Sequence, residues 1–308
     1  MLKKAVGIDI GGTNTNVSLI DETGRILRQF KFRTPKGLSA SSVVEKIFLG
    51  ISESGVFKES SRVGCGVAAL IHPSTGYVDF APNLGWRNFN LKKSLPEGIG
   101  IKKIVFENDA NCAAVGIYKR MKKKVHSLAV ITLGTGIGGG LIIDGKLFSN
   151  PDISAFEVGH TTVDPHGIKC ACGSRGCLET FCGARYMNKW ASKYWAGTKF
   201  EGKILTPHEI ADYARAGKNW AKKVWLKYGE YLAVGVSNLV NLLALDEVVF
   251  TGGIAAGFPF FRESVKKEVA KRTLSPYVKK VRISRASWNS YIGSIGAAFL
   301  VLNNEDGS

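Results

Sequence analysis

The sequence of 308 residues contains no run of 18 apolar residues, so we expect no membrane-spanning helix. It opens with MLKKAVGIDI, where a lysine pair leads straight into a strand-like segment without an apolar leader region. Cysteine is scarce, and Cys65, Cys112 and Cys182 each stand alone among apolar residues. Isolated thiols of this kind are typical of a reducing compartment and not of a disulfide framework. We therefore expect a soluble cytoplasmic protein.

Acidic residues are also few, because 25 Asp and Glu against 42 Lys and Arg leave a formal net charge of +17. Such a surplus attracts polyanions through long-range electrostatics. The lysines, however, are spread along the chain as pairs and triplets, such as Lys122 to Lys124, which is typical of solvated helix faces. Near the cysteines at residues 170–177, the basic residues are only Lys169 and Arg175. We therefore expect no nucleic-acid binding.

Two common nucleotide-binding signatures are missing. Neither the G-x-x-x-x-G-K-[ST] loop nor a G-x-G-x-x-G loop that opens a helix is present, which disfavours P-loop and Rossmann enzymes. Three other glycine-rich turns follow apolar strands, at residues 9–14 (DIGGTN), 133–140 (LGTGIGGG) and 251–254 (TGGI). Glycine lets backbone N–H groups approach an anion closely because it has no Cβ. One such turn is explained by hairpin geometry alone, but three with threonine hydroxyls favour a nucleotide ligand.

The hydrophobic pattern predicts a mixed α/β protein with an internal repeat. A strand, a glycine-rich turn and a second strand at residues 8–20 recur at residues 131–143, which suggests two related lobes with a cleft between them and a boundary within residues 111–124. The predicted strands are residues 5–10, 16–20, 26–34, 63–70, 103–107, 127–133, 140–143, 146–148 and 248–251. The predicted helices are residues 41–54, 184–195, 207–216, 220–243 and 291–302. The first three strands form a meander, and Asp144-Gly145 predicts a hairpin turn.

A cysteine cluster lies within residues 157–179, EVGHTTVDPHGIKCACGSRGCLE. Three thiolates and an imidazole are the ligands that a closed, tetrahedral structural zinc site prefers. The spacing of Cys170, Cys172 and Cys177, with glycines that permit tight turns, predicts such a site. The fourth ligand could be either His160 or His166. Zinc bound here would be scaffold and not catalyst.

Two carboxylates follow predicted strands. Asp9 ends the first strand and could hold Mg²⁺ near phosphates, or it could cap the turn. Asp109 stands where a strand ends and a helix begins, so it could cap that helix. It could equally act as the base that a kinase needs, because an alcohol is a poor nucleophile at neutral pH. The residues alone leave both choices open.

Seven motifs occur along the chain in the order DIGGTN, APNLGW, ENDANCAA, LGTGIGGG, EVGH, CxCGxxGCLE and TGGI. With this order the chain resembles the ROK family of sugar kinases and related repressors, in particular its glucokinase-type members, from residue 7 to about residue 296. The resemblance implies a two-lobed, actin-like ATPase fold of the hexokinase superfamily, with an interlobe cleft and a structural zinc loop. It places residues 1–115 and a C-terminal helix at 290–303 in a small lobe, and residues 116–289 in a large lobe. It also implies a homodimer.

By position in these motifs, the resemblance implies that Asp109 is the general base that deprotonates the 6-hydroxyl of a hexose. The residues implied to bind the sugar are Asn83, Asn108, Asp109, Glu157, His160 and Glu179. The residues implied to bind ATP and Mg²⁺ are Asp9, Gly11, Gly12, Thr13, Gly134, Thr135, Gly136, Gly252 and Gly253. The implied zinc ligands are His160, Cys170, Cys172 and Cys177, a set that selects His160 over His166.

The resemblance predicts an ATP-dependent kinase that forms a hexose 6-phosphate, with glucose as the favoured substrate. Fructose, mannose, allose and N-acetylhexosamines are alternative substrates, and ADP and polyphosphate are alternative donors. A non-catalytic sugar sensor is the other alternative, but the chain starts at its first strand without a preceding winged helix-turn-helix, and it retains Asp109. Two departures from the family pattern, Ile117 in place of a frequent glutamate and DPHG at residues 164–167, bear on substrate preference more than on catalysis.

Overall fold

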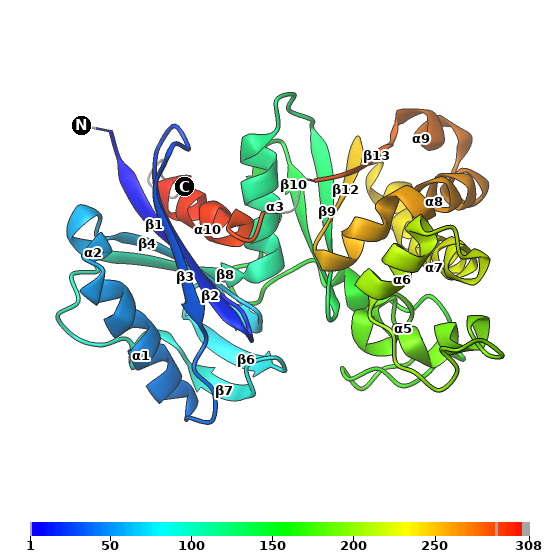
Figure 1. The fold of residues 1–308 in the computed structure, drawn as a ribbon. Coiled ribbons are helices and arrows are strands. Elements are labelled where there is room, and N and C mark those ends of the chain that lie inside the picture. Colours follow the sequence, from blue (N-terminus) through cyan, green and yellow to red (C-terminus); the bar gives the residue numbers. More distant parts are fainter. Residues whose placement is uncertain (1, 287–288, 304–308) are drawn as a thin grey trace. The chain divides into compact units, whose positions relative to one another are not determined.

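The computed structural model describes residues 2–286 and 289–303, which form two compact units (Figure 1). Unit 1 holds the described residues of 1–124, 140–156 and 289–308, and unit 2 holds those of 125–139 and 157–288. Residues 116–124 and 140–156, which the sequence assigned to the second lobe, thus belong to unit 1. The physical reason is helix α3 (Asp109–Arg120), which runs past residue 115. Residue 140 is a glycine packed so tightly on α3 that a Cβ there would lie 2.5 Å from the Cβ of Ala114.

The central sheet of unit 1 has the strand order β3-β2-β1-β4-β8. Its first three strands form the predicted antiparallel meander, and β4 and β8 then add in parallel to β1 and to each other. The bounds are β1 Lys4–Ile10, β2 Asn14–Asp21, β3 Ile26–Arg33, β4 Arg62–Val67 and β8 Lys103–Asn108. The carboxyl ends of the parallel strands β1, β4 and β8 meet at one edge, where ligands gather in α/β sheets.

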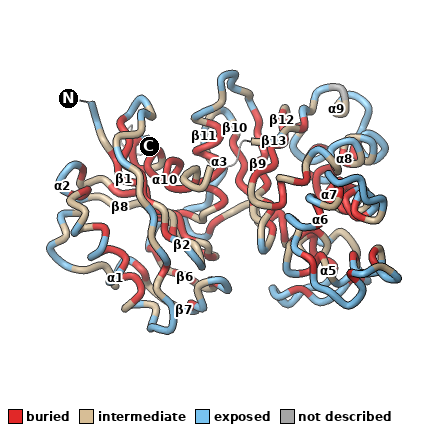
Figure 2. The backbone as a smooth tube through the Cα atoms, viewed as in Figure 1, coloured by how far each residue is buried: buried red, intermediate tan, exposed pale blue. Residues whose placement is uncertain are grey.

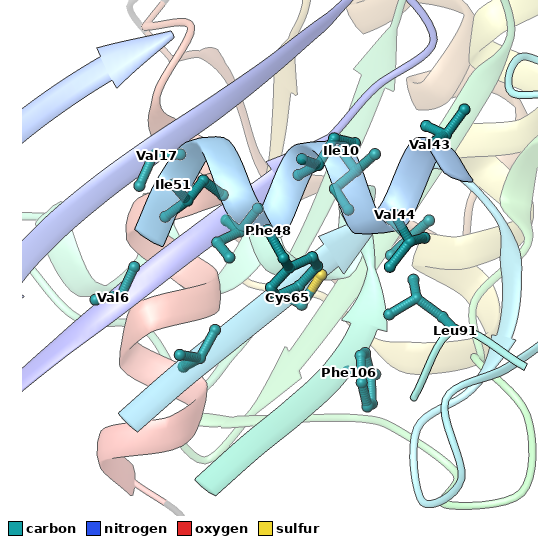
Figure 3. Close-up of a cluster of buried hydrophobic side chains, with 14 of the residues drawn as sticks. Val6, Ile10, Val17, Val43, Val44, Phe48, Ile51, Cys65, Leu91 and Phe106 are labelled. Carbon is teal, nitrogen blue, oxygen red and sulfur yellow. The ribbon is translucent and has the colours of Figure 1, made fainter. Parts of the chain in front are cut away.

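Helices cover both faces of this sheet. Alternate β1 residues point to opposite faces, and Ile10 joins a buried core with Phe48 and Ile51 of α1 (Ala40–Glu53) (Figure 3). On the other face lies α10 (Ile292–Asn303), which closes the chain in unit 1. It packs so closely that a Cβ on Gly7 would lie 1.7 Å from the carbonyl oxygen of Ser294. Glycine at this strand position therefore allows the helix backbone to rest directly on the sheet.

Unit 1 also contains a small antiparallel sheet that the sequence did not predict. Its order is β5-β6-β7, with bounds β5 Leu70–His72, β6 Tyr77–Ala81 and β7 Trp86–Asn90. The APNLGW motif forms the turn between β6 and β7 and carries Asn83. These strands are too short for a clear alternation of apolar and polar residues, which is why the pattern was missed. Two short helices complete the region, α2 (Val56–Glu59) and η1 (Lys92–Ser94).

The second large sheet has the order β11-β10-β9-β12-β13, and the boundary between the units falls within β10, after residue 139. The bounds are β9 Ser127–Leu133, β10 Ile137–Ile143, β11 Lys146–Leu147, β12 Glu247–Thr251 and β13 Arg282–Arg285. Strand β12 runs parallel to both β9 and β13. The predicted hairpin turn between β10 and β11 is confirmed, because Asp144 and Gly145 have φ angles of 50° and 78°.

In unit 2, α6 and α7 match predicted helices and the predicted helix 184–195 is divided into α5 and η3, whereas α4, α8 and α9 had no predicted range. The bounds are η2 Val158–His160, α4 Glu179–Cys182, α5 Ala184–Ala191, η3 Ser192–Tyr194, α6 Pro207–Arg215, α7 Asn219–Leu243, η4 Gly253–Gly257, α8 Phe258–Arg272 and α9 Ser275–Lys280. Most residues of β9, β10 and β12 and of the inward helix faces are buried, whereas outward helix faces are exposed (Figure 2). Within the described ranges, no helix combines the length and the apolar composition needed to cross a membrane.

Candidate functional site

The start of α3 decides how Asp109 is presented. Asn108, and not Asp109, is the N-cap, since its Oδ1 accepts hydrogen bonds from the backbone N–H groups of Ala110 (2.8 Å) and Asn111 (3.3 Å). The Nδ2 of Asn108 donates to the carbonyl oxygen of Ala69 at 3.0 Å. Asp109 is therefore the first helical residue, and its Oδ1 accepts the N–H of Ala110 at 2.9 Å. The helix can begin at this point without using Asp109 as its cap.

Asp109 and Asp9 are neighbouring carboxylates in unit 1. Burial, and then the negative charge of Asp109, raise the pKa of Asp9 from 3.8 to about 7, although the Nδ2 of Asn16 donates to its Oδ2 at 3.4 Å. Burial likewise raises the pKa of Asp109. Helix α10 packs against Asp9, because a Cβ on Gly293 would lie 2.7 Å from the Oδ2 of Asp9. Two buried carboxylates close to each other favour the binding of a proton or a cation, because either one reduces their negative charge.

The first glycine-rich turn lies directly after Asp9. Gly11 donates its N–H to the carbonyl oxygen of Asn14 at 3.1 Å, and the carbonyl oxygen of Thr13 accepts the N–H of Thr34 at 3.0 Å. A Cβ on Gly12 would lie 2.4 Å from the carbonyl oxygen of Asn83. The turn between β6 and β7 therefore packs against the turn between β1 and β2. Five predicted site positions, 9, 11, 12, 13 and 83, are thus brought close together in unit 1.

Unit 2 holds a four-residue cluster of metal-ligand type. One ligand atom from each of His160, Cys170, Cys172 and Cys177 lies within 4.8 Å of all the others. The Sγ of Cys170 lies 3.7 Å from the Nδ1 of His160, and the Sγ atoms of Cys172 and Cys177 are also 3.7 Å apart. A zinc tetrahedron with bonds of about 2.3 Å has edges of about 3.8 Å, so this donor set fits Zn²⁺.

The backbone of residues 160–177, which carries the cluster and is called the knuckle below, folds into tight turns. Cys170 donates its N–H to the carbonyl oxygen of Ser174 at 2.8 Å, and Gly173 donates back to the carbonyl oxygen of Cys170 at 3.1 Å. Gly176 has a φ of 60°, and a Cβ there would lie 1.5 Å from the carbonyl oxygen of Asp164. His166, the other candidate ligand, is instead placed in an exposed turn where its N–H binds the Oδ1 of Asp164 at 2.9 Å.

The second glycine-rich turn is held by the start of α4. The Oε2 of Glu179 accepts the N–H of Ile137 at 3.0 Å, and a Cβ on Gly136 would lie 2.2 Å from the same oxygen. Ala184 donates its N–H to the carbonyl oxygen of Gly134 at 3.0 Å, and the carbonyl oxygen of Thr135 accepts another N–H from α5 at 3.3 Å. Glu179 therefore buttresses the turn at residues 134–136, a contact that its position in the sequence did not predict.

The third glycine-rich turn lies beside the second. Gly252 has a φ of 94°, and a Cβ there would lie 2.4 Å from the carbonyl oxygen of Leu133. The two turns are adjacent because β9 and β12 are parallel neighbours. Gly253 begins η4, with the ring of His208 close by. Glu157 precedes η2, and its carbonyl oxygen accepts the N–H of His160 at 3.0 Å.

The predicted site residues thus fall into two groups. Those in unit 1 are Asp9, Gly11, Gly12, Thr13, Asn83, Asn108 and Asp109, and those in unit 2 are Gly134, Thr135, Gly136, Glu157, His160, Cys170, Cys172, Cys177, Glu179, Gly252 and Gly253. One buried carboxylate close to Asp109 was not singled out from the sequence. Glu107 is 3% exposed and accepts a hydrogen bond from Asn111. A charged residue within an apolar strand, IVFEND, was the available signal.

Known proteins are similar to this chain in sequence and in fold. The chain is 31% identical over 308 residues to a glucokinase from Streptomyces coelicolor, covering 96% of both chains. It is 28% identical over 297 residues to a xylose repressor from Caldicellulosiruptor bescii, covering 91% of this chain and 74% of the repressor. The crystal structure of a ROK family glucokinase from Streptomyces griseus, in complex with glucose and AMPPNP, matches with a TM-score of 0.81 at 29% identity and covers 98% of this chain and 100% of that one.

These matches also identify the fold, which is the actin-like ATPase fold of the hexokinase type. The two large sheets agree with it, because each has three strands joined in sequence at one side and two strands added at the other. The sequence model of the ROK family matches residues 5–304, almost the whole chain. The chain therefore belongs to the ROK family.

Proposed function

We propose that this protein transfers the γ-phosphoryl group of ATP to a hydroxyl of a hexose, with glucose as the favoured substrate and hexose 6-phosphate as the product. The observation that carries the proposal is Asp109, a carboxylate with a raised pKa at the first position of α3 whose capping duty is taken by Asn108. The resemblance to glucokinases at about 30% identity supports the same reaction.

Asp109 acts as the general base in this proposal. Its Oδ1 is occupied by the N–H of Ala110, so Oδ2 receives the proton of the sugar hydroxyl as that oxygen attacks phosphorus. A raised pKa suits this task, because a base is most effective when its pKa approaches the working pH. The α3 N-terminus also favours the ionised carboxylate that must exist before the proton moves.

The glycine-rich turns hold the phosphates in the proposal, through the backbone N–H groups of Gly12, Gly136 and Gly253, while the N–H of Gly11 closes its own turn on Asn14. Asp9 holds Mg²⁺, and this use explains why a carboxylate with a disfavoured charge is kept beside Asp109. Magnesium, when bound, screens the negative charge of the transferring phosphoryl group. The fit rests on the donor chemistry, since carboxylate oxygens are the protein ligands that Mg²⁺ prefers.

The sugar is bound by Asn83, Asn108, Glu157, His160 and Glu179 in this proposal. The contacts already made by these side chains limit which atoms remain for hydroxyl groups. The Nδ1 of His160 faces Cys170, so Nε2 is left for the sugar, and Glu179 keeps Oε1 because Oε2 binds Ile137. Zinc held by His160 and the three cysteines fixes the imidazole orientation. The proposal also includes a homodimer, from the family resemblance, and a cytoplasmic location, from the isolated thiols at Cys65, Cys112 and Cys182.

The first experiment is an ADP-release assay with Mg-ATP across glucose, fructose, mannose, allose and N-acetylhexosamines. We expect the highest kcat/KM with glucose, and product analysis should show phosphate on the 6-hydroxyl. Asp109→Asn should lower kcat by about a thousandfold or more and leave glucose affinity within a few fold, because it removes the base but keeps the shape. Glu45→Gln, an exposed carboxylate on α1, is the matched control and should behave as wild type.

The outcomes separate the alternatives. Turnover with another sugar would keep the reaction and replace glucose as the substrate, and turnover with ADP or polyphosphate would replace ATP. Asp109→Asn with near-normal turnover would remove Asp109 as the base. Sugar binding without turnover for any sugar and donor would support a sensor, the alternative suggested by similarity to a xylose repressor.

A further inference from the structure

Glu107 occupies an unusual position for a carboxylate. It lies on β8, immediately before Asn108 and Asp109, and only 3% of its surface is exposed. A buried carboxylate is costly unless hydrogen-bond donors compensate the lost water. Glu107 has three donors. Its Oε1 accepts the backbone N–H of Asn108 at 2.8 Å and the Nδ2 of Asn111 at 3.0 Å, and its Oε2 accepts the hydroxyl of Ser149 at 2.7 Å.

The two carboxylate oxygens therefore serve two different segments of unit 1. Oε1 binds two residues at the beginning of α3, on either side of Asp109. Oε2 binds Ser149, which follows the β10–β11 hairpin and opens the connecting segment at residues 149–156. A single buried side chain thus joins Asn108 and Asn111, which flank the proposed base in the chain, to a segment about 40 positions further along.

The same connecting segment is held at its far end. The Nδ2 of Asn111 also donates to the carbonyl oxygen of Ala155 at 3.4 Å, and Ser154 donates its N–H to the carbonyl oxygen of Ile71 at 2.8 Å. Phe156 then takes a left-handed conformation, with φ of 71°, which a bulky residue adopts only when its surroundings impose it. The next residue in the chain is Glu157, one of the proposed sugar ligands.

We propose that Glu107 is a positioning residue, which orients Asp109 through its Oε1 and fixes the connecting segment that leads to Glu157 through its Oε2. It does not touch the substrate and transfers no proton. Its three hydrogen-bond partners all donate to its oxygens, so Glu107 acts as an acceptor toward both segments. The role in catalysis rests on the proposed function, whereas the mechanical role of Glu107 in unit 1 does not.

Two variants separate the two sets of contacts of Glu107, which are those of Oε1 with the start of α3 (the α3 arm) and that of Oε2 with Ser149 (the segment arm). Ser149→Ala removes only the donor to Oε2, at an exposed position where little packing is lost. Glu107→Met keeps the approximate length of the side chain but removes both acceptor oxygens, so neither contact can be kept; glutamine would not serve, because its NH₂ group could donate to the Ser149 hydroxyl while its oxygen still accepts from Asn108 and Asn111. Ser54→Ala is the control, because its hydroxyl also makes one short bond in unit 1, to the carbonyl oxygen of Ile51, far from this network in the chain.

The first readout is amide hydrogen exchange, which does not require activity. In Ser149→Ala, peptides covering residues 149–157 should exchange several-fold faster, while those at the start of α3 should keep wild-type rates. In Glu107→Met both regions should exchange faster. Wild-type exchange rates in both regions of both variants would overturn the proposal. If Glu107→Met fails to fold, Ser149→Ala still decides the segment arm.

The second readout is the division between KM and kcat for the best sugar of the wild type. Ser149→Ala should raise the sugar KM by about 3–10-fold with kcat within twofold, and Glu107→Met should also lower kcat by about tenfold or more. A lower Tm with wild-type KM and kcat would mean that Glu107 is only structural. A wild-type protein without activity on any sugar would instead refute the proposed function, and the exchange data would still test the role of Glu107.

Discussion

Asp9 combines a proposed role in catalysis with a cost in stability. Its pKa is raised to about 7, because its charged form is desolvated and lies near Asp109. The folded protein therefore binds this proton more tightly than the unfolded chain, in which the carboxyl titrates near 3.8. Stability consequently falls as pH rises from about 4 to about 7, since the folded state must then give up a proton that the unfolded state has already lost.

Replacing Asp9 by asparagine should relieve this cost. We expect Asp9→Asn to increase the free energy of unfolding at pH 8 by on the order of 1 kcal/mol, or about 2–4 °C in Tm, and to abolish phosphoryl transfer. The gain should shrink toward pH 4, where wild-type Asp9 is also neutral. Urea unfolding at pH 4, 6 and 8 measures this, with Glu45→Gln as an exposed control. A loss of stability at pH 8 would contradict the electrostatic explanation.

Asp109 leads to a prediction about the pH dependence of turnover. Its pKa is raised by burial, so the neutral form, which cannot accept a proton, persists above the ordinary aspartate range. We expect kcat to fall on the acidic side with a midpoint clearly above pH 4, approaching tenfold per pH unit. The pH profile of kcat under saturating sugar and Mg-ATP tests this. Full activity at pH 4 would show that Asp109 is not the group whose ionisation controls turnover.

At the scale of elements, the knuckle around His160, Cys170, Cys172 and Cys177 is the clearest case in which local backbone geometry brings metal-ligand side chains together. It contains little regular secondary structure, and the residues between η2 and α4 are held mainly by turn hydrogen bonds. A structural metal supplies the order that a hydrophobic core would otherwise supply. The knuckle lies between Glu157 and Glu179 in the chain, so a rigid knuckle would fix the positions of both proposed sugar ligands.

Two glycines of the knuckle provide a matched pair of variants. Both have positive φ, but a Cβ on Gly176 would meet the carbonyl oxygen of Asp164 at 1.5 Å, whereas a Cβ on Gly173 would meet no atom within 4 Å. We expect purified wild type and Gly173→Ala to contain about one zinc per chain, and Gly176→Ala to contain much less. Elemental analysis measures the metal. A zinc-free, folded and active wild type would refute the structural zinc site.

At the scale of the whole molecule, the two large sheets share one plan. Strands β1 and β2 in one sheet hold the same places as β9 and β10 in the other, and a glycine-rich turn joins the members of each pair. The repeat at residues 8–20 and 131–143 is therefore a repeat of structure as well as of sequence. A duplicated glycine-rich turn suits the proposed nucleoside triphosphate, whose charge is spread over several groups. The formal charge of +17 is consistent with anionic ligands but does not identify one.

Much of the fold could be predicted because strong local patterns coincide with regular elements. The meander, α1, α7 and the Asp144-Gly145 hairpin all have clear periodicity or turn chemistry. The short strands β5 to β7 lack such a pattern, since pairing with neighbours and not local preference stabilises them. The units could not be delimited from the sequence, because contacts of α3 with residues 140–156 join segments that are distant in the chain.

The sequence alone determined which chemical groups are available and in what order. Glycine-rich turns, the thiol spacing and the carboxylates of ENDA are local properties, because spacing and residue type limit what a short segment can do. Tertiary structure alone decided how those groups are used. It made Asn108 the helix cap, joined Glu107 to Ser149, placed His160 among the cysteines, and raised the pKa of Asp9. Each of these depends on burial and on distances between separate segments, which no single stretch of sequence contains.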